Sequence, residues 1–123
     1  MKDYAHKILC KLKAEYPLPA HIQLSLRCYD KPTLKAAGIV QANCQAFGYV
    51  RRWDDRATIH IALKQTMTKV LNSVAHEYYH CMQKYLLGKP DAYSELEPEA
   101  EKFAREYTFA HLRQINAERK ESL

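Results

Sequence analysis

The stretch from Thr66 to Gly88 repeats its apolar residues with the period of an α-helix. When successive residues are turned by about 100° each, the apolar ones gather on one side. They are Met67, Val70, Leu71, Val74, Tyr78, Cys81, Met82 and Tyr85. Such a stripe has to pack against other elements, so the rest of the chain must supply a core for this helix. Thr66 is the expected N-cap, and Gly88 with Pro90 is expected to end the helix near Leu87.

Five further elements are expected around this helix. Alternating apolar and polar residues predict strands at 21–28, 47–53 and 57–63, with a hairpin turn between the last two. Helices are expected at residues 3–15 and from about Pro98 to Glu118, because proline is favoured at the first position of a helix. The sequence therefore predicts an α+β fold. A small three-stranded sheet packs against an N-terminal helix, the long central helix and a C-terminal helix.

The composition sets limits on the class of protein. The 123 residues fit one domain, expected to span 1–123, and the content of 47% hydrophobic and 27% charged residues excludes wholesale disorder. We find no signal peptide and no apolar run near the ~18 residues of a membrane span, so no membrane partner is expected. Four cysteines, at positions 10, 28, 44 and 81, form no C-x-x-C pair. We expect them to be free, buried thiols of a cytoplasmic protein.

Opposite its apolar stripe, the central helix carries His76-Glu77-Tyr78-Tyr79-His80, which matches H-E-x-x-H. Residues four apart lie about one turn apart on the same helix face, so His76 and His80 can bind one zinc ion through ring nitrogens. Glu77 is turned about 100° from His76, which suits a general base that reaches an activated water without binding the metal. A histidine of the core would lie inside the apolar stripe, and these two do not.

A catalytic zinc site usually has three protein ligands, so a third ligand is expected from elsewhere in the chain. The segment 95–101 offers four carboxylates: Glu95, Glu97, Glu99 and Glu101. Histidine is the competing ligand type, and His60 and His111 are the alternatives. His111 would lie about 21 Å along a helix from Glu97, so these two cannot bind the same ion. Pro98 biases Glu97 away from helical geometry, which suits an N-cap position.

The block from Glu97 to Ala104 resembles the E-x-x-A-x-x-F-A element of the ImmA/IrrE-like small gluzincin metallopeptidases, which also carry H-E-x-x-H on a preceding helix. The resemblance covers roughly residues 57 to 110. It implies a minimal zincin-like fold with Glu97 as the third zinc ligand. It also implies that Glu101 hydrogen-bonds a ligating histidine and so orients its ring. Glu101 is also the fallback ligand, and Glu95 and Glu99 are weaker alternatives.

By this resemblance the chain is expected to be a zinc-dependent peptidase with one Zn²⁺ ion and with Glu77 as its general base. The resemblance also implies that the edge of the strand Ile59-His60-Ile61 binds an extended peptide by backbone hydrogen bonds. Candidate donors to the reacting carbonyl oxygen are Tyr79, Tyr93, Tyr107 and His111. Proteins of this family often act on repressors, so the expected partner is a peptide or protein substrate such as a repressor on a separate chain.

Two other functions compete with this one. The first is a catalytically inactive, metal-binding regulatory domain of the same fold, which would keep all the residues named above. The second is a basic nucleic-acid-binding module, suggested by the net charge of +5 and the pI near 9.0. The basic residues are scattered, and neither a recognition helix nor an aromatic platform is evident, so we do not expect a nucleic-acid partner.

Overall fold

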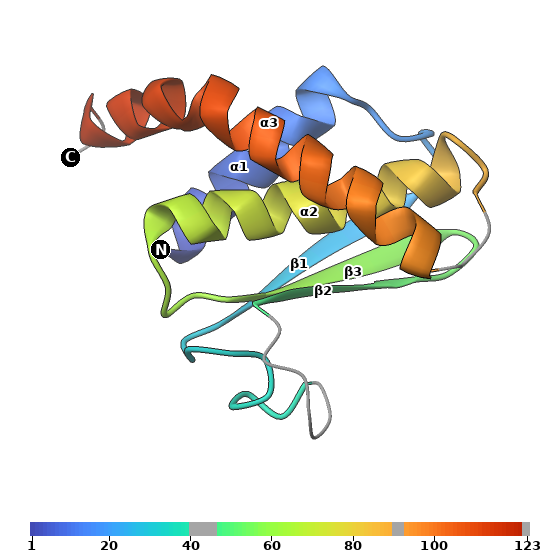
Figure 1. The fold of residues 1–123 in the computed structure, drawn as a ribbon, viewed down its shortest axis with the longest axis horizontal. Helices are drawn as coiled ribbons and strands as arrows, with labels where there is room; N and C mark the ends of the chain where they lie inside the picture. Colours follow the sequence, from blue (N-terminus) through green and yellow to red (C-terminus); the bar gives the residue numbers. More distant parts are fainter. Residues whose placement is uncertain (40–46, 90–92, 122–123) are drawn as a thin grey trace.

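The computed structural model describes residues 1–39, 47–89 and 93–121. Three helices and a three-stranded sheet make up an α+β fold, as the sequence predicted (Figure 1). The elements, in chain order, are α1 (Lys2–Glu15), β1 (Gln23–Tyr29), β2 (Gly48–Arg52), β3 (Arg56–Ala62), α2 (Met67–Tyr85) and α3 (Tyr93–Glu121).

The sheet has the order β1-β3-β2. The expected hairpin is confirmed, because β2 pairs antiparallel with β3 and Val50 lies opposite Ile59. Strand β1 pairs parallel with the other side of β3, with Arg27 opposite His60. The prediction that Ile59-His60-Ile61 offers a free edge is therefore wrong. Both sides of β3 are already hydrogen-bonded, and β2 is the edge strand beside α2.

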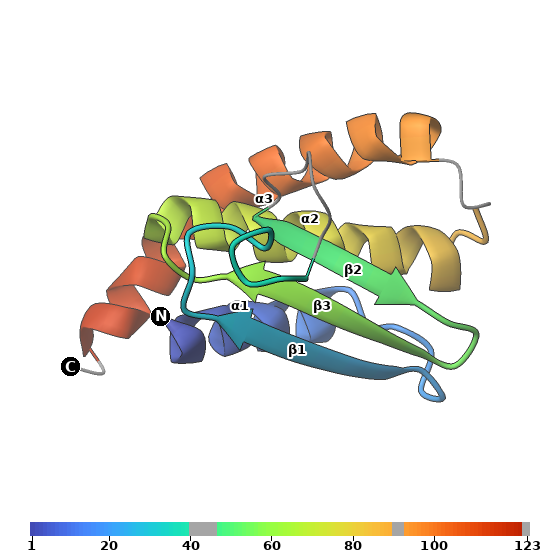
Figure 2. The same cartoon turned by 90° about the horizontal axis from the view of Figure 1, so that it is seen from below.

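All three helices lie on one side of the sheet, and α2 passes between the sheet and α3 (Figures 1 and 2). Alternate residues of β3 point into this helical layer, so Ile59 and Ile61 are buried while His60 lies on the opposite face. The core joins them to the stripe of α2 and to apolar residues of α1. Its fully buried side chains include Ile8, Leu12, Ile59, Ile61, Val70, Leu71, Val74 and Tyr78.

The ends of α2 follow the sequence prediction, whereas the start of α3 does not. Thr66 caps α2, its side-chain oxygen accepting a hydrogen bond from the backbone nitrogen of Lys69 at 3.2 Å. Gly88 lies past the end of the helix with φ +62°, a conformation that favours glycine. Helix α3 begins at Tyr93, so Pro98 lies inside it rather than at its first position. Glu97 is correspondingly a helical residue and not an N-cap.

Among the described residues, no helix has the length and apolar character needed to cross a membrane. The three described cysteines carry free thiols, but the expectation that all are buried is wrong. Cys81 is buried in the core, Cys28 is half-buried and Cys10 is exposed on α1. Cys44 lies outside the described residues.

Candidate metal centre

Helices α2 and α3 bring two imidazoles and one carboxylate together. His76 and His80 lie one turn apart on α2, and their ring centroids are 4.9 Å apart with the planes at 73°. The Glu97 carboxylate on α3 lies across from both rings. Its Oε2 is 3.2 Å from Nε2 of His76, and its Oε1 is 2.7 Å from Nε2 of His80. One potential ligand atom from each of the three residues lies within 4.8 Å of the others.

These distances suit a small divalent cation. Two atoms bound to one zinc ion at about 2.0–2.1 Å in tetrahedral geometry are about 3.3 Å apart. The separations between Nε2 of His76 and the Glu97 oxygens, 3.2 and 3.3 Å, match that value. The separation between His80 and Glu97 is shorter, so an ion would need only a small outward movement of this carboxylate. Because the Glu97 side chain is 40% exposed, such a movement requires no repacking of the core.

A buried glutamine fixes the orientation of His80. The Gln83 side-chain nitrogen donates to the backbone carbonyl oxygen of Leu96 at 2.9 Å, which leaves its amide oxygen 2.8 Å from Nδ1 of His80. An amide oxygen only accepts, so Nδ1 of His80 carries the proton. Gln83 therefore holds the position next to a ligating histidine that the sequence prediction assigned to Glu101. A polar residue three positions past His80, on the same helix face, was the signal for it.

The hydrogen bond from His80 to Gln83 leaves Nε2 of His80 as an acceptor, and this atom faces the Glu97 carboxylate, which is also an acceptor. Burial lowers the pKa of His80, so the ring is neutral near pH 7. With the proton on Nδ1, the Nε2 atom presents a lone pair, and it faces the Glu97 carboxylate at 2.7 Å. Two lone pairs at this distance repel each other unless a positive charge lies beside them. The arrangement is therefore suited to a cation, and imidazole with carboxylate is a donor set that zinc accepts.

The histidine face of α2 is covered rather than open to solvent. His80 is only 1% exposed although it lies outside the apolar stripe, because α3 packs over this side of α2. The side chain of His76 keeps 16% of its surface exposed. Two solvated surface histidines would not be covered to this extent.

Glu77 lies next to the three candidate ligands. It is 8% exposed, and its Oε2 is 4.0 Å from Nε2 of His76. Burial, and then the neighbouring carboxylate of Glu97, raise the pKa of Glu77 to about 8, against a smaller opposite effect of Arg52. The carboxyl group is therefore poised to hold or release a proton near neutral pH.

The edge strand β2 runs alongside α2 and closes one side of the site. A Cβ atom at Gly48 would lie 3.1 Å from Cγ and 3.2 Å from Oε2 of Glu77, closer than an ordinary van der Waals contact, so any other residue here would push against this side chain. At the other end of β2, Nη1 of Arg52 donates to the backbone carbonyl oxygen of His80 at 2.7 Å. Further on, the Tyr85 hydroxyl donates to the carbonyl oxygen of Trp53 at 2.6 Å. These contacts align β2 with the helix that carries the candidate ligands.

The other carboxylates of the segment 95–101 lie outside the cluster. Glu99 accepts hydrogen bonds from Lys89 and, at 3.5 Å, from the Tyr79 hydroxyl. Glu95 and Glu101 are exposed. Of the four carboxylates, Glu97 is the one that joins the two histidines in a cluster able to hold a metal.

The competing histidines have partners elsewhere. Nδ1 of His60 is 2.8 Å from the Tyr29 hydroxyl, on the side of the sheet away from the helices, where burial and then Arg27 lower its pKa. His111 lies further along α3, with Nε2 3.0 Å from Oε2 of Glu15.

Of the four candidate oxyanion donors, Tyr107 and His111 contact Glu15 and so lie away from the site. The side chain of Tyr93 is not among those described. Tyr79 lies between α2 and α3 beside the site, and burial, followed by Glu99, raises its pKa.

The chain matches no protein-family model, no curated protein sequence and no solved structure. The resemblance to ImmA/IrrE-like metallopeptidases thus remains an expectation drawn from residues 76–80 and 97–104 of this chain.

Proposed function

We propose that this protein is a zinc-dependent peptidase in which His76, His80 and Glu97 hold the metal. One observation carries the proposal: a neutral, buried imidazole, fixed by Gln83, directs its lone pair at a carboxylate beside a second imidazole. A cation removes the repulsion in this arrangement, and H-E-x-x-H supplies the neighbouring carboxyl group that hydrolysis requires.

Zinc held in such a site lowers the pKa of a water molecule to about 7 and polarises a substrate carbonyl group. Glu77 accepts the proton of the attacking water and later delivers it to the leaving amine. Its pKa of about 8 describes the protein without a cation, and a nearby positive charge lowers the pKa of a carboxyl group. Metal binding would therefore bring Glu77 into the ionised form that a general base needs.

The substrate expected here is an extended peptide bound along the edge of β2 that pairs with no other strand of the described residues. Backbone groups at the edge of a sheet can pair with an added strand. Gly48 lets such a strand pass close to Glu77, and the contact between Arg52 and His80 keeps the edge in register with the ligands. Tyr79 remains the candidate donor to the reacting carbonyl oxygen, and its hydroxyl would have to turn from Glu99 to reach it.

The biological partner and compartment are extensions of the same proposal. A repressor protein on a separate chain is the substrate that the family resemblance favours, and the cytoplasm is the expected location. The free thiols of Cys10, Cys28 and Cys81 are in keeping with a reducing compartment.

The test compares Glu77→Gln with wild type after both are loaded with zinc. The amide keeps the shape of the side chain and removes the base, so turnover of unstructured peptides should fall by about two to four decades while zinc remains bound. Glu106→Gln, an exposed residue of α3, is the matched control and should change neither quantity. Stoichiometric zinc without hydrolysis by wild type would instead favour the metal-binding regulatory domain.

A further inference from the structure

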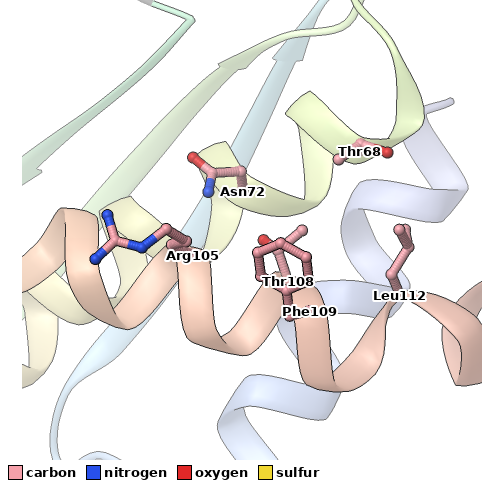
Figure 3. A pocket seen from close by; sticks show the side chains of 6 residues that line it. All are labelled: Thr68, Asn72, Arg105, Thr108, Phe109 and Leu112. Carbon is pink, nitrogen blue, oxygen red and sulfur yellow. The ribbon is translucent and has the colours of Figure 1, made fainter.

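A groove of about 400 Å³ lies between the first half of α2 and the middle of α3. Figure 3 shows Thr68 and Asn72 on one side of it, and Arg105, Thr108, Phe109 and Leu112 of α3 on the other. Phe109 is 82% exposed, which is unusual for a large aromatic side chain without a partner. The groove therefore offers apolar surface that a bound group could cover.

A second hollow of about 340 Å³ continues the groove toward the sheet. It shares Thr68, Asn72 and Thr108 with the first and adds Ser73 and Phe47. The ring of Phe47 is 38% exposed, with Nζ of Lys69 5.4 Å from its centroid. The two hollows together form the α2–α3 groove, which reaches from Phe47 to Leu112.

This groove is continuous with the proposed active site in two ways. Asn72 and Ser73 lie one turn before His76 and Glu77, on the same face of α2. Phe47 directly precedes Gly48, where a Cβ atom would lie 3.1 Å from the Glu77 side chain. A peptide that passes Glu77 along the edge of β2 would therefore reach the groove without changing direction.

The geometry also predicts the direction in which a bound peptide runs and the distance from its scissile bond to the groove. β2 runs with α2, from Gly48 beside Glu77 to Arg52 beside His80. Antiparallel pairing is the more stable per residue, and a peptide paired this way would run from Arg52 toward Phe47. Asn72 and Thr68 lie about 6 and 12 Å before His76 along the helix axis. An extended peptide covers about 3.3 Å per residue, so these levels correspond to about two and four residues past the scissile bond.

We infer that the α2–α3 groove binds one bulky apolar side chain of the substrate, located about two to four residues to the carboxyl side of the scissile bond. The inference rests on the proposed peptidase function and adds a substrate class to it: unstructured segments with phenylalanine, leucine or methionine at that distance. Burial of such a side chain is expected to raise kcat/KM by about 10- to 100-fold over serine at the same position.

The experiment uses nonapeptides of alanine, glycine and serine in which one phenylalanine, leucine or methionine is moved through every position. Zinc-loaded wild-type protein is incubated with the set, and mass spectrometry reports the cleaved bond and the flanking residues. The preferred apolar residue should occupy the second to fourth place after the bond. Cleavage without a preference there would overturn the groove inference and leave the peptidase proposal standing.

Two variants change the groove in opposite ways. Phe109→Ser removes one wall, and Thr68→Trp fills the groove from the other side; both residues are exposed, so the fold should persist. Each should lower the preference for apolar residues, measured as the ratio of kcat/KM between the phenylalanine and serine peptides, at least fivefold. Lys102→Ser, exposed on α3 outside the groove, is the control. A preference retained in both variants would also overturn the inference.

Binding provides a readout that does not need hydrolysis. In zinc-loaded Glu77→Gln, the phenylalanine peptides should shift the backbone amide resonances of Thr68, Asn72 and Phe109, and the serine peptides should not. Such shifts without any cleavage by wild type would support the groove and count against the peptidase. Absence of these shifts at millimolar peptide would overturn the groove whatever the activity.

Discussion

The candidate metal centre and the cluster of Glu15, Tyr107 and His111 both involve α3, and both join histidine to glutamate. In the second cluster Nε2 of His111 faces Glu15 at 3.0 Å and Nδ1 donates to the carbonyl oxygen of Tyr107 at 3.1 Å. Both ring nitrogens face acceptors, so a doubly protonated ring satisfies them without any other ion.

The metal centre lacks this solution. His80 is buried, its pKa is lowered and a second imidazole lies beside it, so protons cannot easily neutralise the cluster. The difference distinguishes a candidate metal site, where two buried rings converge on one carboxylate, from a single histidine–glutamate contact. An isolated, partly exposed pair is an ordinary ion pair.

The largest contrast should come from removing one histidine from each cluster. His80→Ala is expected to lose bound zinc and peptide turnover, because two ligands hold the ion far more weakly than three. His76→Ala, at a less buried position, should do the same. His111→Ala should keep one zinc per chain. Elemental analysis after dialysis measures all three, with circular dichroism as the check on folding. Equal zinc content in the His80 and His111 variants would remove the distinction between the clusters.

The pH dependence of stability should also differ between the two clusters. The folded-state pKa of Glu77 is about 8, above its ordinary value of 4.5, so the folded protein holds a proton that the unfolded chain releases. For metal-free protein the contribution of Glu77 to the free energy of unfolding should therefore decrease by about 1.4 kcal/mol per pH unit between about pH 5 and 8. Below pH 4 the contribution is fully present, and above pH 8 it is lost.

Glu77→Gln should flatten this dependence in urea unfolding of the metal-free protein. Glu106→Gln, on the exposed side of α3, should leave it unchanged. An unchanged slope in the Glu77 variant would show that this carboxyl group does not keep its proton in the folded state.

A smaller effect is expected when the support of His80 is removed. Gln83→Leu leaves Nδ1 of His80 and the carbonyl oxygen of Leu96 without their shared partner. Zinc affinity should decrease by about 10- to 100-fold, because such supporting hydrogen bonds fix the ring orientation. Gln114→Leu changes the same residue type at an exposed position of α3 and should have no effect. Competition with a chromophoric chelator gives both affinities, and equal values would contradict the role of Gln83.

The smallest effect should follow from breaking the ion pair of the second cluster. Glu15→Gln removes the charge that faces His111, at a side chain that is 34% exposed. The expected loss is about 0.2–1 kcal/mol of the free energy of unfolding, and less at high salt. Denaturant unfolding at two salt concentrations measures it. A loss several times larger, or a loss of zinc, would mean that the two clusters are not as distinct as their geometry indicates.

Local signals explain what could be predicted from the sequence. The period of α2, its Thr66 cap and the hairpin of β2 and β3 depend on neighbours in the chain, and the structure has them where expected. The pairing of β1 with β3 depends on contacts distant in sequence, so the strand expected at the edge is in the centre. Gln83 was missed because its role depends on Leu96, which α3 brings back against α2.

The start of α3 was misplaced because a local rule was outweighed by tertiary contacts. Pro98 cannot donate the hydrogen bond expected of an interior helical residue, which favours a helix start at that point. The ion pair between Lys89 and Glu99 and the bond from Gln83 to Leu96 hold the first turns of α3 against α2 nevertheless. This extra length places Glu97 on a regular helix facing both rings.

The absence of a side chain at Gly48 bears on the proposed hydrolysis and not on the proposed metal binding. A Cβ atom there would lie 3.2 Å from Oε2 of Glu77, closer than an ordinary contact, so the carboxyl group would have to move. If Glu77 is the general base that we propose, a substitution at this position would impair hydrolysis without changing any of the three candidate metal ligands. Among proteins with the same H-E-x-x-H motif, the residue at the position of Gly48 could then distinguish a hydrolase from a protein that only binds the metal.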